Sequence, residues 1–188
     1  MGEPFRARTA GDDALARWFY GADRNRDGGI DADEMQADAA RFFATLDADH
    51  DGEIDPGELN HYELEVAPEI QLAARTLRKP GEAEPSRKRK AVEEFNSVMG
   101  TGGALQGGAR YALLNIPEPV AAADTDFDRG ISLDEFRQAA ARRFELLDSV
   151  RTGRLTLQEL QTLREAQLET RHKGDADARV GNGLPTAD

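Results

Sequence analysis

The amino-acid sequence predicts an all-α protein, and three observations support this fold class. Apolar residues recur with helical spacing, as in Leu15, Trp18, Phe19 and Ala22, which fall at i, i+3, i+4 and i+7. Four acidic segments, each beginning with Asp and ending with Glu eleven residues later, lie next to such patterns. No long run alternates apolar and polar residues, as a half-buried strand would. We therefore expect amphipathic helices joined by acidic loops.

The four acidic segments form two pairs with the same internal spacing. They are Asp23–Glu34, Asp47–Glu58, Asp124–Glu135 and Asp148–Glu159, called loops 1 to 4 below. Within each pair the starts lie 24 residues apart (47 − 23 and 148 − 124), and the pairs are offset by 101 residues (124 − 23). This regularity indicates duplication of a two-loop unit.

The two pairs of loops divide the chain into four predicted parts. Pro80 and Gly81 interrupt helices and mark the start of a linker, and the polar, glycine-containing end of the chain predicts disorder. We expect the two halves to pack as one compact domain. The predicted parts are a first pair of loops at 12–79, a linker with a helical insert at 80–115, a second pair at 116–171 and a disordered tail at 172–188.

Oxygen-bearing residues recur at alternate positions of the loops, a spacing that suits a hard cation. Calcium takes roughly six to eight oxygen ligands, and the sharp turn that gathers them favours glycine at position 6. Positions 1, 3, 5, 7, 9 and 12 resemble the calcium-binding loop of the EF-hand family, in which position 7 provides a backbone carbonyl and position 12 a bidentate Glu. The resemblance implies these ligands: Asp23, Asn25, Asp27, Gly29, Asp31 and Glu34 in loop 1; Asp47, Asp49, Asp51, Glu53, Asp55 and Glu58 in loop 2; Asp124, Asp126, Asp128, Gly130, Ser132 and Glu135 in loop 3.

Loops 3 and 4 depart from this pattern. In loop 3, Arg129 replaces the turn glycine, and a left-handed conformation there costs about 1–2 kcal/mol, which predicts weaker binding. In loop 4, Val150 offers no oxygen at position 3, and Thr152 is a poor substitute at position 5. Positions 9 and 12 also form capping boxes in all four loops, and capping alone is the better interpretation of loop 4. We therefore expect two or three Ca²⁺ ions, in loops 1 to 3, and a degenerate loop 4.

The spacing of the loops also predicts how they meet. Position 8 is apolar in every loop, and in EF-hands this residue forms a short strand contact with a partner loop. Only Met35–Leu46 separates loop 1 from loop 2, so a single helix of about 18 Å must join them. Loops at opposite ends of one helix cannot lie side by side, and Phe136–Leu147 implies the same for loops 3 and 4. We expect pairing between the halves, through Ile30, Ile54, Ile131 and Leu155.

The tight spacing raises a second interpretation of the metal. It is similar to that of lanmodulin-like proteins, the bacterial lanthanide-binding EF-hand proteins, and Asp31 and Asp55 at position 9 are similar as well. The proline that those proteins carry at position 2 is missing, since Arg24, Ala48 and Thr125 stand there. Calcium binding is thus the main prediction, and lanthanide binding is the alternative.

Composition narrows the remaining choices of function. The formal net charge of −12 argues against nucleic acid as a partner, and no apolar run reaches the length of a membrane span. Without cysteine, and with few histidines and no nucleophile motif, we expect no enzyme activity. The predicted role is a calcium sensor or buffer, and a protein partner stays open. Abundant Arg and Ala are typical of a bacterial source, and the family resemblance implies a periplasmic or secreted location, with the cytoplasm as the alternative.

Overall fold

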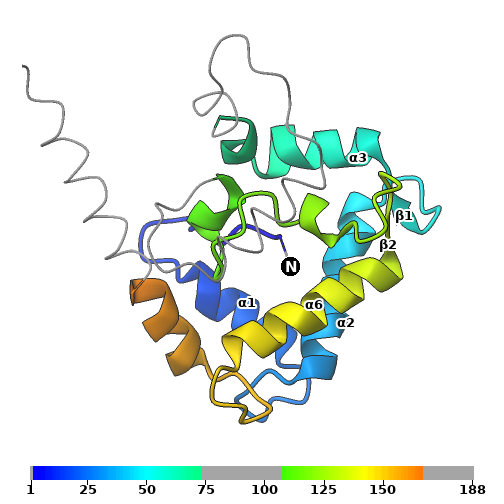
Figure 1. The fold of residues 1–188 in the computed structure, drawn as a ribbon. Helices are drawn as coiled ribbons and strands as arrows, with labels where there is room; N and C mark the ends of the chain where they lie inside the picture. Colours follow the sequence, from blue (N-terminus) through cyan, green and yellow to red (C-terminus); the bar gives the residue numbers. More distant parts are fainter. Residues whose placement is uncertain (1, 73–106, 167–188) are drawn as a thin grey trace, which may run out of the picture.

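The computed structural model describes residues 2–72 and 107–166, which form a mostly helical fold with one small sheet (Figure 1). This confirms the predicted helical class. The predicted tail at 172–188 and most of the predicted linker lie outside the described residues. The elements are α1 (Ala14–Ala22), α2 (Ala32–Leu46), β1 (Glu53–Ile54), α3 (Pro56–His61), the π-helical turn η1 (Tyr62–Val66), the 3₁₀ turns η2 (Gly107–Tyr111) and η3 (Ala121–Ala123), β2 (Ile131–Ser132), α6 (Leu133–Leu147) and a helix over 157–166.

Helices α2, α3 and α6 begin where the sequence places capping boxes. The Asp31 side chain accepts a hydrogen bond from the Glu34 amide at 2.8 Å, and the Glu34 carboxylate accepts one from the Asp31 amide at 3.2 Å. Asp55 with Glu58, and Ser132 with Glu135, repeat this arrangement. Because each box satisfies backbone amides that a helix start leaves without partners, positions 9 and 12 of these loops define the first turn of the next helix.

One continuous helix joins the two loops of each pair. Helix α2 starts directly after position 9 of loop 1 and ends at Leu46, beside the first residue of loop 2. Helix α6 relates loops 3 and 4 in the same way and also has 15 residues. The shared helix that the spacing predicted is therefore confirmed.

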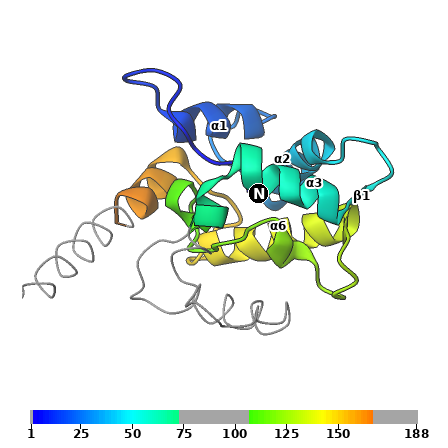
Figure 2. The ribbon, with the colours of Figure 1, turned by 90° about the horizontal axis from the view of Figure 1, so that it is seen from above.

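The centre of the molecule is the contact between α2 and α6. Phe136 of α6 is fully buried, and its ring centroid lies 5.7 Å from that of Phe43 and 6.5 Å from that of Phe42, both on α2. In the view from above (Figure 2), α1 and α6 lie on opposite sides of α3. None of the described helices has the length and apolar character needed to cross a membrane.

The loops pair between the two halves of the chain, as the spacing predicted. Strands β1 and β2 are antiparallel and place Ile54 of loop 2 opposite Ile131 of loop 3. An isolated antiparallel bridge joins Ile30 of loop 1 to Leu155 of loop 4, with amide-to-carbonyl distances of 2.9 and 2.8 Å. Loops 2 and 3 therefore meet at one end of α2 and α6, and loops 1 and 4 meet at the other end, at the bottom of Figure 1.

Candidate metal centre

All four loops share an unusual backbone, with left-handed residues at positions 4 and 6. Loop 3 adopts this conformation at position 6 even though Arg129 stands there, with φ at 88°. The sequence did not predict the positive φ at position 4, because residues such as Arg and Phe rarely adopt this conformation and give no signal of it. The residues at position 4 are Arg26, His50, Phe127 and Arg151, with φ between 56° and 65°, and the glycines at position 6 are Gly28, Gly52 and Gly153, with φ between 77° and 90°.

The aspartate at position 1 of each loop is buried and faces the inside of the turn. Asp47 Oδ1 accepts a hydrogen bond from the amide at position 5 at 3.1 Å, and Oδ2 accepts one from the amide of Gly52 at 3.2 Å. Loops 1 and 4 repeat these contacts. In loop 3, Asp124 Oδ1 accepts from the amide of Phe127 at 2.7 Å. Each loop is therefore wrapped around a carboxylate held by backbone amides.

The glutamate at position 12 closes loops 1, 2 and 3. In loop 1, Glu34 Oε1 accepts from the amide of Arg24, at position 2, at 2.8 Å, and its other oxygen takes part in the capping box. Glu58 and Glu135 accept from position 2 of their own loops at 2.6 and 2.8 Å. The two carboxylate oxygens thus join position 2 of the loop to position 9.

The Glu135 carboxylate is held in its charged form. Burial by itself would raise the pKa of this group, but hydrogen bonds from Ser132 and Thr125 outweigh that effect and lower the pKa to about 2. Hydrogen bonds to a carboxylate favour its ionised state. A cation-binding loop needs this state, because a protonated carboxyl group is a poor ligand.

Loop 4 keeps its shape by other means. The Thr152 hydroxyl bonds to Asp148 Oδ1 at 3.1 Å and to the carbonyl of Arg154 at 2.8 Å. Among the described residues, Glu159 bonds only within its capping box with Thr156 and does not reach the start of the loop. Val150 is 74% exposed. The loop thus replaces oxygen ligands with internal hydrogen bonds; whether it has lost the metal stays a prediction.

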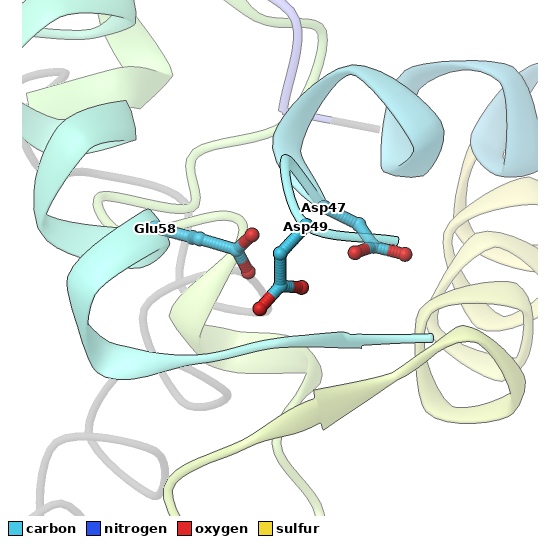
Figure 3. A group of neighbouring side chains, drawn as sticks. All are labelled: Asp47, Asp49 and Glu58. Carbon is cyan, nitrogen blue, oxygen red and sulfur yellow. The ribbon is translucent and has the colours of Figure 1, made fainter. Parts of the chain in front are cut away.

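Carboxylates converge in loops 2 and 3. One oxygen each from Asp47, Asp49 and Glu58 lies within 4.8 Å of the others. Figure 3 shows Glu58 reaching from the start of α3 toward Asp49, with Asp47 beside it. The second such group in the described part of the chain is Asp124, Asp126 and Asp128 of loop 3. Three hard oxygen donors at this spacing fit Ca²⁺.

Loop 1 has the amide of Asn25 at position 3, where loops 2 and 3 have an aspartate that belongs to the group, so it lacks the same group of acidic side chains. Asp27 Oδ1 accepts from the amide of Gly29 at 3.0 Å and from the guanidinium of Arg154 at 2.7 Å. Asp27 Oδ2 accepts from the side-chain amide of Asn25 at 3.1 Å. Both carboxylate oxygens therefore already have protein donors, and one donor, Arg154, comes from loop 4. No pattern in the sequence pointed to Arg154.

The remaining predicted ligands cap helices or bond backbone amides of their own loops. Asp31, Asp55 and Ser132 at position 9 cap the helices that follow their loops. Asp51 Oδ1 accepts from the amide of Glu53 at 2.9 Å, and Asp128 Oδ1 accepts from the amide of Gly130 at 2.8 Å. Burial, followed by the negative charge of Asp128 and Asp51, raises the pKa of Glu53.

Comparison with known proteins supports the same family for two segments in the first third of the chain. Residues 15–37 and 39–61 each match the family model described as EF hand. These matches contain loops 1 and 2 and parts of the helices around them. No curated protein and no solved structure matches the chain. The matched segments support an EF-hand calcium-binding family; the bacterial source, the duplication and the lanmodulin-like spacing stay predictions.

Proposed function

We propose that this protein binds Ca²⁺ in loops 1, 2 and 3 and is stabilised by it, acting as a calcium buffer or sensor and not as an enzyme. The observation that carries the proposal is the group of Asp47, Asp49 and Glu58, whose oxygens lie within 4.8 Å of one another inside a segment that matches the EF-hand model. Residue type, spacing and fold thus agree at loop 2.

Each loop would supply oxygen ligands both from its turn and from the helix that follows it. The aspartates at positions 1 and 3 and the side chain at position 5 provide oxygens from the turn, and the glutamate at position 12 adds its oxygens from the first turn of the following helix. The ion itself supplies positive charge, which offsets the repulsion between these carboxylates. Filling three loops would change the formal charge from −12 to about −6. Binding and folding are therefore coupled.

Buffering fits the described residues better than the opening of a methionine-rich groove. Sensor EF-hands expose such a groove when they bind calcium. Met35 is the one methionine among the described residues, and it is 4% exposed within the core. In a periplasmic or secreted location, abundant calcium would also fill a weaker site such as loop 3.

Calorimetric titration of the metal-stripped protein tests the proposal. We expect two or three calcium sites with dissociation constants of about 10⁻⁷–10⁻⁵ M, with much weaker binding of Mg²⁺ and a higher thermal unfolding temperature in calcium. A parallel titration with a trivalent lanthanide tests the alternative metal. Tight lanthanide binding beside negligible calcium binding would replace calcium with the lanthanide, and no binding of either ion would refute a metal-binding function.

A further inference from the structure

At each strand contact, one long charged side chain crosses to the partner loop. Both of these side chains stand at position 7, Glu53 in loop 2 and Arg154 in loop 4. Each side chain enters the space beside the glycine at position 7 of the partner loop. Glu53 lies against Gly130 of loop 3, and Arg154 lies against Gly29 of loop 1. A Cβ atom on Gly130 would overlap the Glu53 carboxylate, and one on Gly29 would overlap the Arg154 guanidinium. Each pair thus combines one charged residue with the glycine that makes room for it.

In the pair of loops 1 and 4, the crossing side chain is a cation that bonds a predicted metal ligand. Arg154 Nη2 donates to Asp27 Oδ1 at 2.7 Å and to the Asp27 backbone carbonyl at 2.9 Å. The two side chains form an ion pair, with 44% of the Arg154 side chain and 50% of the Asp27 side chain exposed. Asp27 is position 5 of loop 1, so a metal ion in this loop would compete with the guanidinium for the same oxygen.

In the pair of loops 2 and 3, the crossing side chain is an anion. Glu53 projects against Gly130, the neighbour in sequence of Arg129 and two residues from Asp128. Loop 3 already holds the grouped carboxylates of Asp124, Asp126 and Asp128. The added carboxylate increases the negative charge that a cation in loop 3 would meet.

We propose that the side chain at position 7 sets the metal affinity of the loop across the strand contact, so that Arg154 lowers the affinity of loop 1 and Glu53 raises the affinity of loop 3. This inference rests on the proposed calcium-binding function. A unit charge within hydrogen-bonding distance of a ligand changes the energy of a nearby divalent ion, and solvent and salt reduce the effect at an exposed pair. The order of filling would then place loop 2 before loop 1, although both have complete ligand sequences.

The test isolates loop 1 by combining Glu58→Gln with Glu135→Gln, which remove the position 12 carboxylates of loops 2 and 3. Calcium binding to this background is then measured by calorimetry with and without Arg154→Gln. We expect Arg154→Gln to tighten calcium binding by about three- to tenfold. Arg110→Gln is the matched control, because it removes the same charge from an exposed residue outside the loops and should leave the affinity unchanged.

A second measurement needs no metal. Arg154→Gln removes the ion-pair partner of Asp27, so the metal-free protein should unfold at a slightly lower temperature. Arg154→Lys keeps the positive charge, so its calcium affinity and its unfolding temperature should both lie between those of the unaltered protein and Arg154→Gln. For loop 3, Glu53→Gln in a background of Glu34→Gln and Glu58→Gln should weaken calcium binding by about two- to fivefold.

The outcomes separate this inference from the function on which it rests. If the unaltered protein binds calcium but Arg154→Gln leaves the affinity of loop 1 the same or weaker, the role of Arg154 is wrong and the binding function stands. If the unaltered protein binds neither calcium nor a lanthanide in any loop, the proposed function itself fails. Equal tightening by Arg154→Gln and Arg110→Gln would also overturn the inference, because it would reduce the effect to net charge.

Discussion

The pair of loops 2 and 3 and the pair of loops 1 and 4 have nearly the same backbone and opposite electrostatics. Both pairs are joined by an antiparallel contact between apolar residues at position 8, and all four loops have positive φ angles at positions 4 and 6. The residue that crosses the contact is Glu53 in one pair and Arg154 in the other. Grouped carboxylates occur in the first pair, and an ion pair between loops occurs in the second.

The comparison teaches that a loop's own sequence does not determine its electrostatic surroundings. Loop 1 has a suitable residue at every ligand position, whereas loop 3 has an arginine in place of the turn glycine. In the structure, loop 3 brings three carboxylates together, and Asp27 of loop 1 bonds a guanidinium from the other half of the chain. In loops 1 and 3 a charged side chain of the partner loop therefore stands beside the candidate site, and the following predictions test how far the two pairs differ.

The largest expected effect comes from the strand contacts, where we expect the two pairs to behave alike. Ile131 is fully buried opposite Ile54, and Ile131→Ala should lower the free energy of unfolding by about 2–5 kcal/mol because it leaves a cavity. Leu155→Ala is the matched variant in the other pair. Chemical denaturation of the metal-free proteins measures both. A loss below about 1 kcal/mol for either variant would show that its contact contributes little to stability.

Removing the glutamate at position 12 should lower calcium affinity in loop 2 and have no such effect in loop 4. Glu58→Gln replaces one carboxylate of the group in loop 2 by a neutral amide. We expect calcium affinity to fall about a hundredfold at one site, which is a loss of about 2.7 kcal/mol in binding free energy. Glu159→Gln makes the same change in loop 4 and should alter no calcium site. Calorimetry distinguishes the two variants, and a calcium site lost in Glu159→Gln would contradict the assignment of loop 4 as degenerate.

Position 6 offers a test of backbone strain in the pair of loops 2 and 3. Gly52 has φ at 90°, and a Cβ atom there would meet nothing within 4 Å, so Gly52→Ala should cost about 1–2 kcal/mol through backbone conformation alone. Arg129→Gly should do the reverse in loop 3, gaining about 0.5–1 kcal/mol, since the added freedom of glycine in the unfolded chain offsets part of the relief. Thermal unfolding of the metal-free proteins measures both changes. Destabilisation by Arg129→Gly would show that the arginine side chain compensates for the strain.

The smallest expected effect is the response of Glu135 to acid. Its pKa in the folded protein is about 2, below the ordinary value of 4.5, so its contribution to stability is complete above about pH 4.5 and is lost as the pH falls toward 2. Because solvent reaches this partly buried group and weakens the effect, we expect only about 1 kcal/mol. Acid titration of metal-free protein, compared with Glu135→Gln, measures it. The variant should have a flatter pH dependence in this window, and identical curves would contradict the assigned hydrogen bonds.

Much of the fold could be predicted because the relevant signals are local. Capping boxes at positions 9 and 12 predicted where α2, α3 and α6 begin, since a helix start depends on hydrogen bonds within four residues. The short separation between loops 1 and 2 predicted one shared helix, and its length then excluded pairing within a half. The sequence also predicts the ligand types, because calcium coordination uses closely spaced residues of one loop; these ligands stay a prediction.

Other features had no local signal. The positive φ of Phe127 and Arg151 follows from the turn that the whole loop adopts, not from preferences of those side chains. The hydrogen bond between Arg154 and Asp27 joins residues 127 positions apart, so no periodic pattern in the chain predicts it. Glu53 was predicted only as a carbonyl ligand, and its side chain meets Gly130 because β1 pairs with β2.

The sequence by itself therefore determined the helical class and the helix starts, and it predicts the oxygen donors of loops 1 to 3. The tertiary structure decided which charged side chain stands next to which set of donors. The physical reason is one of range: capping and ligand spacing act over a few residues along the chain, whereas the charge that a cation meets sums over every group nearby in space. Packing of α2 against α6 brings loop 4 to loop 1 and loop 3 to loop 2. This contact places the Arg154 cation beside Asp27 and the Glu53 anion against Gly130.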